Sequence, residues 1–139
     1  MKDLRSMVEQ MMDAVPRRDF GTIRQMLHPE YSFTTGDGQR QEGIEAGIAV
    51  LETYTNAFPD MRLEIKQMNL AGNIVTTEFV CHGTHKGELF GIAPTNRQVK
   101  IPVCNIVEFR DGKVFAQREY FDTMFLMQQL GVEVGHEHA

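Results

Sequence analysis

The spacing of apolar residues along the chain changes once, near residue 61, and this change constrains the fold more than any other feature of the sequence. Before it, apolar residues recur about every 3.6 residues, as over residues 4–12, which is the pattern of an amphipathic helix. After it, apolar and polar residues alternate, as over residues 99–109, which is the pattern of a half-buried strand. Helices followed by a run of strands predict an α+β domain with the helices against one face of a sheet.

Proline, glycine and capping residues predict where the elements begin and end. Pro16 ends a first helix, and Pro29 ends a short second helix whose N-cap is Asp19. A third helix follows Gly43 and ends at Pro59. We expect strands over residues 31–35, 62–70, 74–85, 99–109 and 114–122, a hairpin turn at 110–113 and a short helix at 125–130. The strands after residue 61 predict an antiparallel meander.

The composition of the 139-residue chain excludes several classes of protein. Its 42% hydrophobic and 24% charged residues suit one packed domain, which we place at residues 1–132, followed by a polar tail at 133–139. The 14 basic and 19 acidic residues leave a net charge of −5, which argues against a nucleic-acid partner. No apolar run reaches the about 20 residues of a membrane span, and no signal peptide is evident, so we expect a cytoplasmic protein without a membrane partner.

The sequence carries no motif for a metal or a cofactor. Cys81 and Cys104 are the only cysteines, and their apolar, strand-like surroundings predict reduced, buried thiols. His136 and His138 predict a solvated tail. Because phosphate loops, zinc spacings and nucleophile elbows are all absent from the sequence, we expect neither metal nor cofactor.

One amide interrupts the apolar face of the strand expected over residues 99–109. Asn105 stands among Val99, Ile101, Val103, Val107 and Phe109. An unpaired buried amide costs about 1–3 kcal/mol, so Asn105 needs a partner. Either the backbone supplies that partner or the amide lines a pocket, and the sequence leaves both open.

The two faces of the return strand carry different residues. One face carries Arg118, Tyr120 and Asp122, and the other carries Phe115, Gln117, Glu119 and Phe121. Asp122 lies where the strand meets the last helix, so it either caps that helix or projects into a cavity. Burial in an apolar cavity would raise the pKa of Asp122 and suit it to acid/base catalysis, whereas Arg118 beside it would lower that pKa.

Histidines offer a second group that could carry a proton. His82 and His85 lie on opposite faces of their strand if it contains no bulge, so at most one of them faces the interior. A structural role and a catalytic role are both open for each.

Several short stretches form a family pattern. Residues 83–95 read GTHKGELFGIAPT, and later stretches read DGKV (111–114), REYFD (118–122) and QLG (129–131). Near the amino end, residues 18–20 read RDF and residues 27–31 read LHPEY. These stretches resemble the SnoaL-like polyketide and ester cyclases of the nuclear transport factor 2-like superfamily, whose signature is GTHxGxFxGIxPTG. The likeness spans nearly the whole chain.

The resemblance implies a fold, an assembly and a reaction. The fold is a cone-shaped, curved antiparallel sheet of about four to six strands, wrapped by three amino-terminal helices, with a short carboxy-terminal helix. The assembly is a homodimer through the outer face of the sheet. Characterised members close the last ring of aromatic polyketides by an intramolecular aldol reaction without a cofactor. Their essential aspartate maps onto Asp122, and Asn105 with His82 or His85 would hold the developing oxyanion.

We therefore expect a cofactor-independent, cyclase-type enzyme that acts on a small, hydrophobic, carbonyl-containing molecule. Its catalytic groups would be Asp122, Asn105 and an inward His82 or His85. The pocket would be lined by Tyr31, Phe33, Tyr54, Phe58, Asn105, Arg118 and Tyr120. An Asp122 fixed as a helix cap would contradict this site.

Three other functions use the same scaffold. The first is a non-catalytic protein that binds a small molecule. The second is an isomerase, a dehydratase or an epoxide hydrolase that uses other pocket residues. The third is a purely structural dimer joined through Cys104, Ile106, Phe115 and Phe121. Function is grafted onto a fold rather than set by it, so the fold alone does not separate them.

Overall fold

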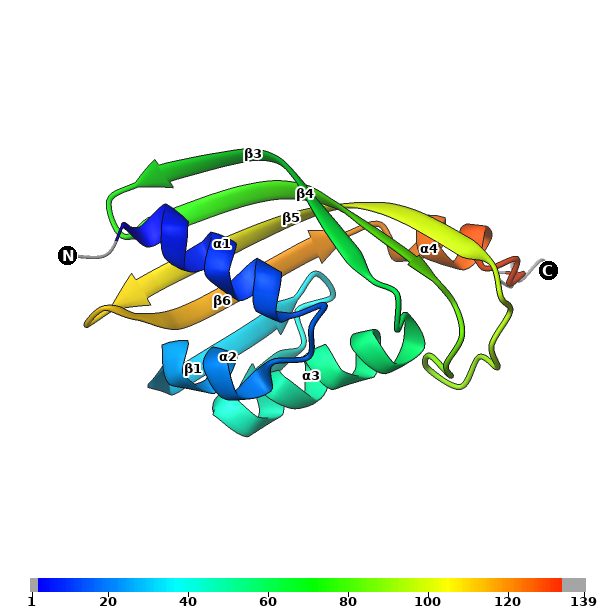
Figure 1. Cartoon of the computed structure of the whole chain (residues 1–139), viewed down its shortest axis with the longest axis horizontal. Coiled ribbons are helices and arrows are strands. Elements are labelled where there is room, and N and C mark those ends of the chain that lie inside the picture. The colour runs from blue at the N-terminus through cyan, green and yellow to red at the C-terminus, as the bar shows by residue number, and fades with distance from the viewer. Residues whose placement is uncertain (1–2, 134–139) are drawn as a thin grey trace.

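The computed structural model of the chain describes residues 3–133. Within them, four helices and six strands form the predicted α+β fold with a curved sheet, which is not closed into a barrel (Figure 1). The tail expected at 133–139, with His136 and His138, lies outside the described residues except for Glu133. No helix in the described part of the chain is long and apolar enough to cross a membrane.

Two of the helices begin where the sequence predicted, after Asp19 and after Gly43. The bounds are α1 (Leu4–Ala14), α2 (Phe20–Met26), α3 (Ile44–Ala57) and α4 (Thr123–Gln129). The Thr22 backbone N–H donates to Oδ1 of Asp19 at 3.2 Å, which confirms Asp19 as the N-cap of α2. Gly43 precedes α3 with φ 97°, a left-handed conformation that glycine adopts without strain.

The strands pair in the order β2-β1-β6-β5-β4-β3. Their bounds are β1 (Leu27–Thr35), β2 (Arg40–Glu42), β3 (Arg62–Ala71), β4 (Ile74–Thr84), β5 (Gln98–Arg110) and β6 (Lys113–Phe121). β3 to β6 form the expected antiparallel meander. β1 differs from the expectation because it pairs parallel to β6, and the sequence did not predict β2, which has no apolar alternation.

Irregularities in strand pairing accompany the curvature of the sheet. The register shifts between Ile65 and Gln67 of β3 and between Glu108 and Phe109 of β5. Such a shift places an extra residue on one strand and increases the local twist. The sheet curves around α1, and α2 and α3 lie below it in the view of Figure 1. This arrangement brings the inner face of the sheet and the helices around a shared interior.

Candidate active site

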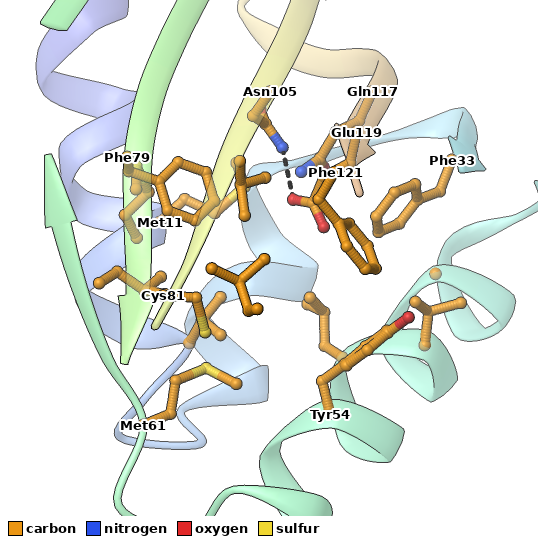
Figure 2. A pocket seen from close by; sticks show the side chains of 18 of the residues that line it. Met11, Phe33, Tyr54, Met61, Phe79, Cys81, Asn105, Gln117, Glu119 and Phe121 are labelled. Atoms are coloured by element: carbon orange, nitrogen blue, oxygen red, sulfur yellow. Dashed lines mark hydrogen bonds between the residues drawn. The ribbon is translucent and has the colours of Figure 1, made fainter. Parts of the chain in front are cut away.

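The interior contains a cavity of about 110 Å³ between the inner face of the sheet and the helices. Most of its wall is aliphatic, aromatic or methionine side chain. The residues on its wall that carry a polar side-chain group are Tyr31, Tyr54, Cys81, Asn105, Gln117 and Glu119. Figure 2 shows Asn105, Gln117 and Glu119 gathered on one side of the cavity, with Tyr54 and Cys81 on other parts of its wall.

The polar side of the cavity is built by strand register. Asn105 of β5 pairs with Glu119 of β6 and, on its other side, with Thr77 of β4. Residues paired in this way project from the same face of a sheet. Gln117 lies two residues before Glu119 on β6 and therefore shares that face.

Among residues 3–133, Glu119 is the only carboxylate on the cavity wall. The Asn105 side-chain amide donates to Oε2 of Glu119 at 2.9 Å (Figure 2). Burial raises the pKa of Glu119, and the hydrogen bond from Asn105 opposes this rise only in part. The residue keeps some accessible surface and faces the cavity, yet protein atoms surround its carboxylate. Glu119 is thus a buried acid that a cavity ligand can reach.

The other titratable groups of the wall stay protonated near neutral pH. Burial, with the nearby Glu119 carboxylate as a smaller cause, raises the pKa of Tyr54 to about 12 and that of Cys81 to about 12. Burial also raises the pKa of Tyr31. The ordinary pKa of glutamate lies far below those of tyrosine and cysteine, so Glu119 is the described wall residue best suited to take up and return a proton.

Five of the predicted pocket residues lie on the cavity wall. They are Tyr31, Phe33, Tyr54, Phe58 and Asn105. The partner of the Asn105 amide is a side chain on the wall, so the pocket alternative for Asn105 describes its position correctly. Contact of these five residues with a substrate stays a prediction.

The expected position of Asp122 is wrong. Asp122 is exposed and caps α4, and the Phe125 backbone N–H donates to its Oδ1 at 3.0 Å. The start of a helix leaves backbone N–H groups without partners, and a carboxylate at the N-cap satisfies one of them. Asp122 therefore does not face the cavity, and the helix-cap alternative describes it correctly.

Arg118 and Tyr120 also lie outside the cavity. They project from the outer face of the sheet, where Arg118 lies 3.9 Å from Glu108 and Tyr120 is 43% exposed. Phe121, expected on a dimer surface, instead lines the cavity. Gln117, Glu119 and Phe121 share one face of β6, as predicted. That face points into the cavity, and the face with Arg118 and Tyr120 points away from it.

Neither histidine of β4 and its following loop lines the cavity. His82 projects outward, with its Nε2 2.8 Å from Oε1 of Glu64 on β3. His85 is fully buried just after β4, where the Thr95 backbone N–H donates to its Nδ1 at 3.2 Å and its ring lies against Phe58. The expectation of an inward histidine in the pocket is wrong.

Sequence reasoning missed the two wall residues Gln117 and Glu119. A hairpin with a two-residue turn and no bulge pairs Arg110 with Lys113 and would place Asn105 opposite Arg118. The register shift between Glu108 and Phe109 moves this pairing by one residue, which puts Glu119 opposite Asn105. The available signal was Phe121, an aromatic residue on the same face as Glu119.

No group of three or more His, Cys, Asp or Glu side chains that could hold a metal ion occurs in residues 3–133.

The sequence model of the SnoaL-like polyketide cyclase family matches residues 5–130, nearly the whole described chain. The chain belongs to the SnoaL-like polyketide cyclase family. This confirms the family that the sequence motifs predicted.

Curated relatives agree with this assignment, and a solved structure shares the fold. The chain is 28% identical over 130 residues to the aklanonic acid methyl ester cyclase AcmA of Streptomyces galilaeus, across 89% of this chain and 88% of that protein. It is 27% identical over 114 residues to the nogalonic acid methyl ester cyclase of Streptomyces nogalater, across 78% and 83%. The crystal structure of IdmH from Streptomyces antibioticus has the same fold, with a TM-score of 0.82, 24% identity and coverage of 94% and 100%.

The family signature at residues 83–95 covers the end of β4 and the loop after it, and none of its residues lines the cavity of this SnoaL-like family member. The backbone N–H groups of Lys86 and Gly87 both donate to the carbonyl of Ala57, at the end of α3. A Cβ on Gly87 would overlap the carbonyl oxygen of Asn56, so glycine is required for this approach. These contacts tie the end of α3 to the segment that follows β4.

Proposed function

We propose that this chain is a cyclase that closes a ring in a hydrophobic, polyketide-like substrate, with Glu119 as the general acid/base. The curated relatives are named as cyclases of aklanonic and nogalonic acid methyl esters, which supports a carbonyl-rich, largely apolar substrate. The mostly apolar wall of the cavity suits such a molecule. The single observation that carries the proposal is that Glu119, alone among the described carboxylates, lies on this wall and has a raised pKa.

The proposed reaction is an intramolecular aldol step. The Glu119 carboxylate takes a proton from the carbon next to a substrate carbonyl, and the electron pair of that C–H bond forms an enolate. The enolate carbon bonds to a second carbonyl carbon of the same molecule, whose C=O π bond breaks to leave an alkoxide. The alkoxide takes the proton back from Glu119. The carboxylate is regenerated, and no oxidant or reductant is consumed.

The surroundings of Glu119 suit both halves of this proton transfer. A raised pKa makes its carboxylate a stronger base than an exposed one, while the protonated form can still release the proton. The Asn105 amide, 2.9 Å from Oε2, holds the carboxylate in one orientation. Asn105 thus acts as a positioning residue for Glu119.

The proposal is tested by ring closure of aklanonic acid methyl ester and nogalonic acid methyl ester. Purified wild type, E119Q and D122N are compared by chromatography of the products. We expect E119Q to be about 10²- to 10⁴-fold slower, because it removes the proton carrier and keeps the size of the side chain. D122N is the matched control, because asparagine is also a good N-cap, and we expect it to retain the wild-type rate.

Two results would contradict the proposal. Equal rates for E119Q and wild type would show that Glu119 does not carry the proton. A wild type that binds these esters but closes neither ring would favour the non-catalytic binding protein.

A further inference from the structure

A second polar pair lies on the cavity wall beside Glu119, and the proposed proton transfer does not use it. The Tyr31 hydroxyl of β1 donates to Oε1 of Gln117 on β6 at 2.8 Å. Both residues are buried, with 2% and 8% of their surface exposed, and both line the cavity. A hydrogen bond of this kind fixes the side chains that it joins.

Tyr31 is itself held in place and stays a donor. Gly47 of α3 approaches its ring so closely that a Cβ at that position would overlap it. Burial raises the pKa of Tyr31, so the hydroxyl keeps its proton. Gln117 Oε1 is the only acceptor of this hydroxyl among the described residues, and a buried hydroxyl without an acceptor would be destabilising. The amide oxygen of Gln117 therefore faces Tyr31.

This orientation leaves the amide nitrogen of Gln117 for the cavity. Within residues 3–133, no protein group accepts a hydrogen bond from Nε2, and this nitrogen is not among the fully enclosed atoms without a partner. It therefore keeps accessible surface, which on the inward face of β6 is cavity surface. Figure 2 shows the Gln117 side chain next to that of Glu119.

We infer that Gln117 binds a carbonyl oxygen of the substrate, and that Tyr31 orients its amide for this contact. Gln117 and Glu119 project from one face of β6 with Cα atoms roughly 7 Å apart. A carbonyl group placed between them can accept an N–H bond from Gln117 while its α-proton faces the Glu119 carboxylate. The same donor would stabilise the negative charge that develops on that oxygen in the enolate. The role of Gln117 in the reaction rests on the proposed function. The binding of a carbonyl group by Gln117 rests on the geometry alone.

Two small probes of the same shape test the binding directly. Acetophenone carries a C=O group where α-methylstyrene carries C=CH₂, so only acetophenone can accept a hydrogen bond. Their dissociation constants are measured by NMR titration, and the ratio of the two constants is compared among proteins. The cost of removing each probe from water is the same for every protein and cancels in this comparison.

We expect Q117L to reduce the preference for acetophenone by about three- to tenfold, the range of one neutral hydrogen bond. Y31F is expected to reduce it as well, because the amide is then free to rotate. Y120F makes the same chemical change at an exposed tyrosine on the outer face and should leave the preference unchanged. In the wild type, acetophenone should shift the side-chain NH₂ signal of Gln117 more than α-methylstyrene does.

Removing one partner can destabilise the fold, because the other is left buried without a hydrogen bond. The double variant Y31F/Q117L removes both partners and avoids this penalty. The inference is overturned if the preference for acetophenone is unchanged in Q117L or in the double variant, or if wild type does not bind acetophenone. An unchanged preference in Y31F overturns the role of Tyr31. These experiments measure binding and not ring closure, so their outcome does not depend on whether the chain is a cyclase.

Discussion

At the scale of single residues, burial of its carboxylate distinguishes Glu119 from the other described acids for which a pKa shift is resolved. Most carboxylates for which a shift is resolved have a lowered pKa, because hydrogen bonds or cations stabilise their charge, as at Asp19 and Glu64. Glu119 has one amide partner and no cation, so burial dominates and its pKa rises. Burying an acid of this kind costs folding free energy, and such groups are concentrated at functional sites.

This shift predicts how stability depends on pH. The pKa of Glu119 is higher in the folded protein than in the unfolded chain, so folding favours its protonated form. That stabilisation is complete below the ordinary glutamate pKa of about 4.3 and is lost as the pH rises through the raised folded pKa. The side chain at this position in E119Q cannot ionise, so the variant does not lose stability in this way. We therefore expect the free energy of unfolding of E119Q, relative to wild type, to increase over this pH range.

Urea unfolding of both proteins at a series of pH values measures this difference. A difference that stays flat, or that falls as the pH rises, would show that the folded protein does not disfavour the Glu119 carboxylate. D122N unfolded in parallel serves as the control for an exposed acid.

The sequence predicted some of the site residues but not the acid. An isolated amide on an apolar strand face was enough to single out Asn105. The choice between Asp122 and Glu119 depended on which face of β6 points inward, and alternation gives two faces without saying which is buried. The family motif favoured Asp122, whereas the structure gives it a backbone partner at the start of α4.

At the scale of elements, one irregularity in the β5–β6 hairpin decides the composition of the site. Without it, Asn105 would face Arg118, and the cavity would contain a cation. With it, Glu119 takes that place and Arg118 moves to the outer face near Glu108. A bulge depends on local backbone geometry and has no fixed sequence pattern. Periodicity therefore predicted both strands but not their register.

The start of α4 provides a prediction at this scale. D122A removes the acceptor for the Phe125 N–H, and we expect it to lower the free energy of unfolding by about 0.5–2 kcal/mol, as for other N-caps. D122N should keep most of the stability. Urea unfolding measures both effects. A D122A protein as stable as wild type would show that this cap does not contribute, and a D122A protein that folds but loses cyclase activity would contradict the assignment to Glu119.

At the scale of the whole molecule, the helices and the curved sheet enclose a single polar cluster in an apolar cavity. The change of hydrophobic period predicted the helices, the meander and a sheet with one face covered by helices, but not which face that is. It did not predict that β1 joins β6 in parallel, because pairing between strands distant in sequence leaves no local signal. The homodimer implied by the family stays a prediction. Its expected surface, the outer face of the sheet, carries Cys104, Ile106 and Tyr120.

The central claim is that the cavity holds one functional acid, Glu119, kept at a raised pKa by burial. A pH titration of the ¹³C signal of its side-chain carboxyl, assigned by its loss in E119Q, tests this claim most directly. We predict a titration midpoint clearly above the ordinary glutamate value of about 4.3. A midpoint at or below that value would contradict the claim, because an acid of ordinary strength would not be the desolvated proton carrier described above.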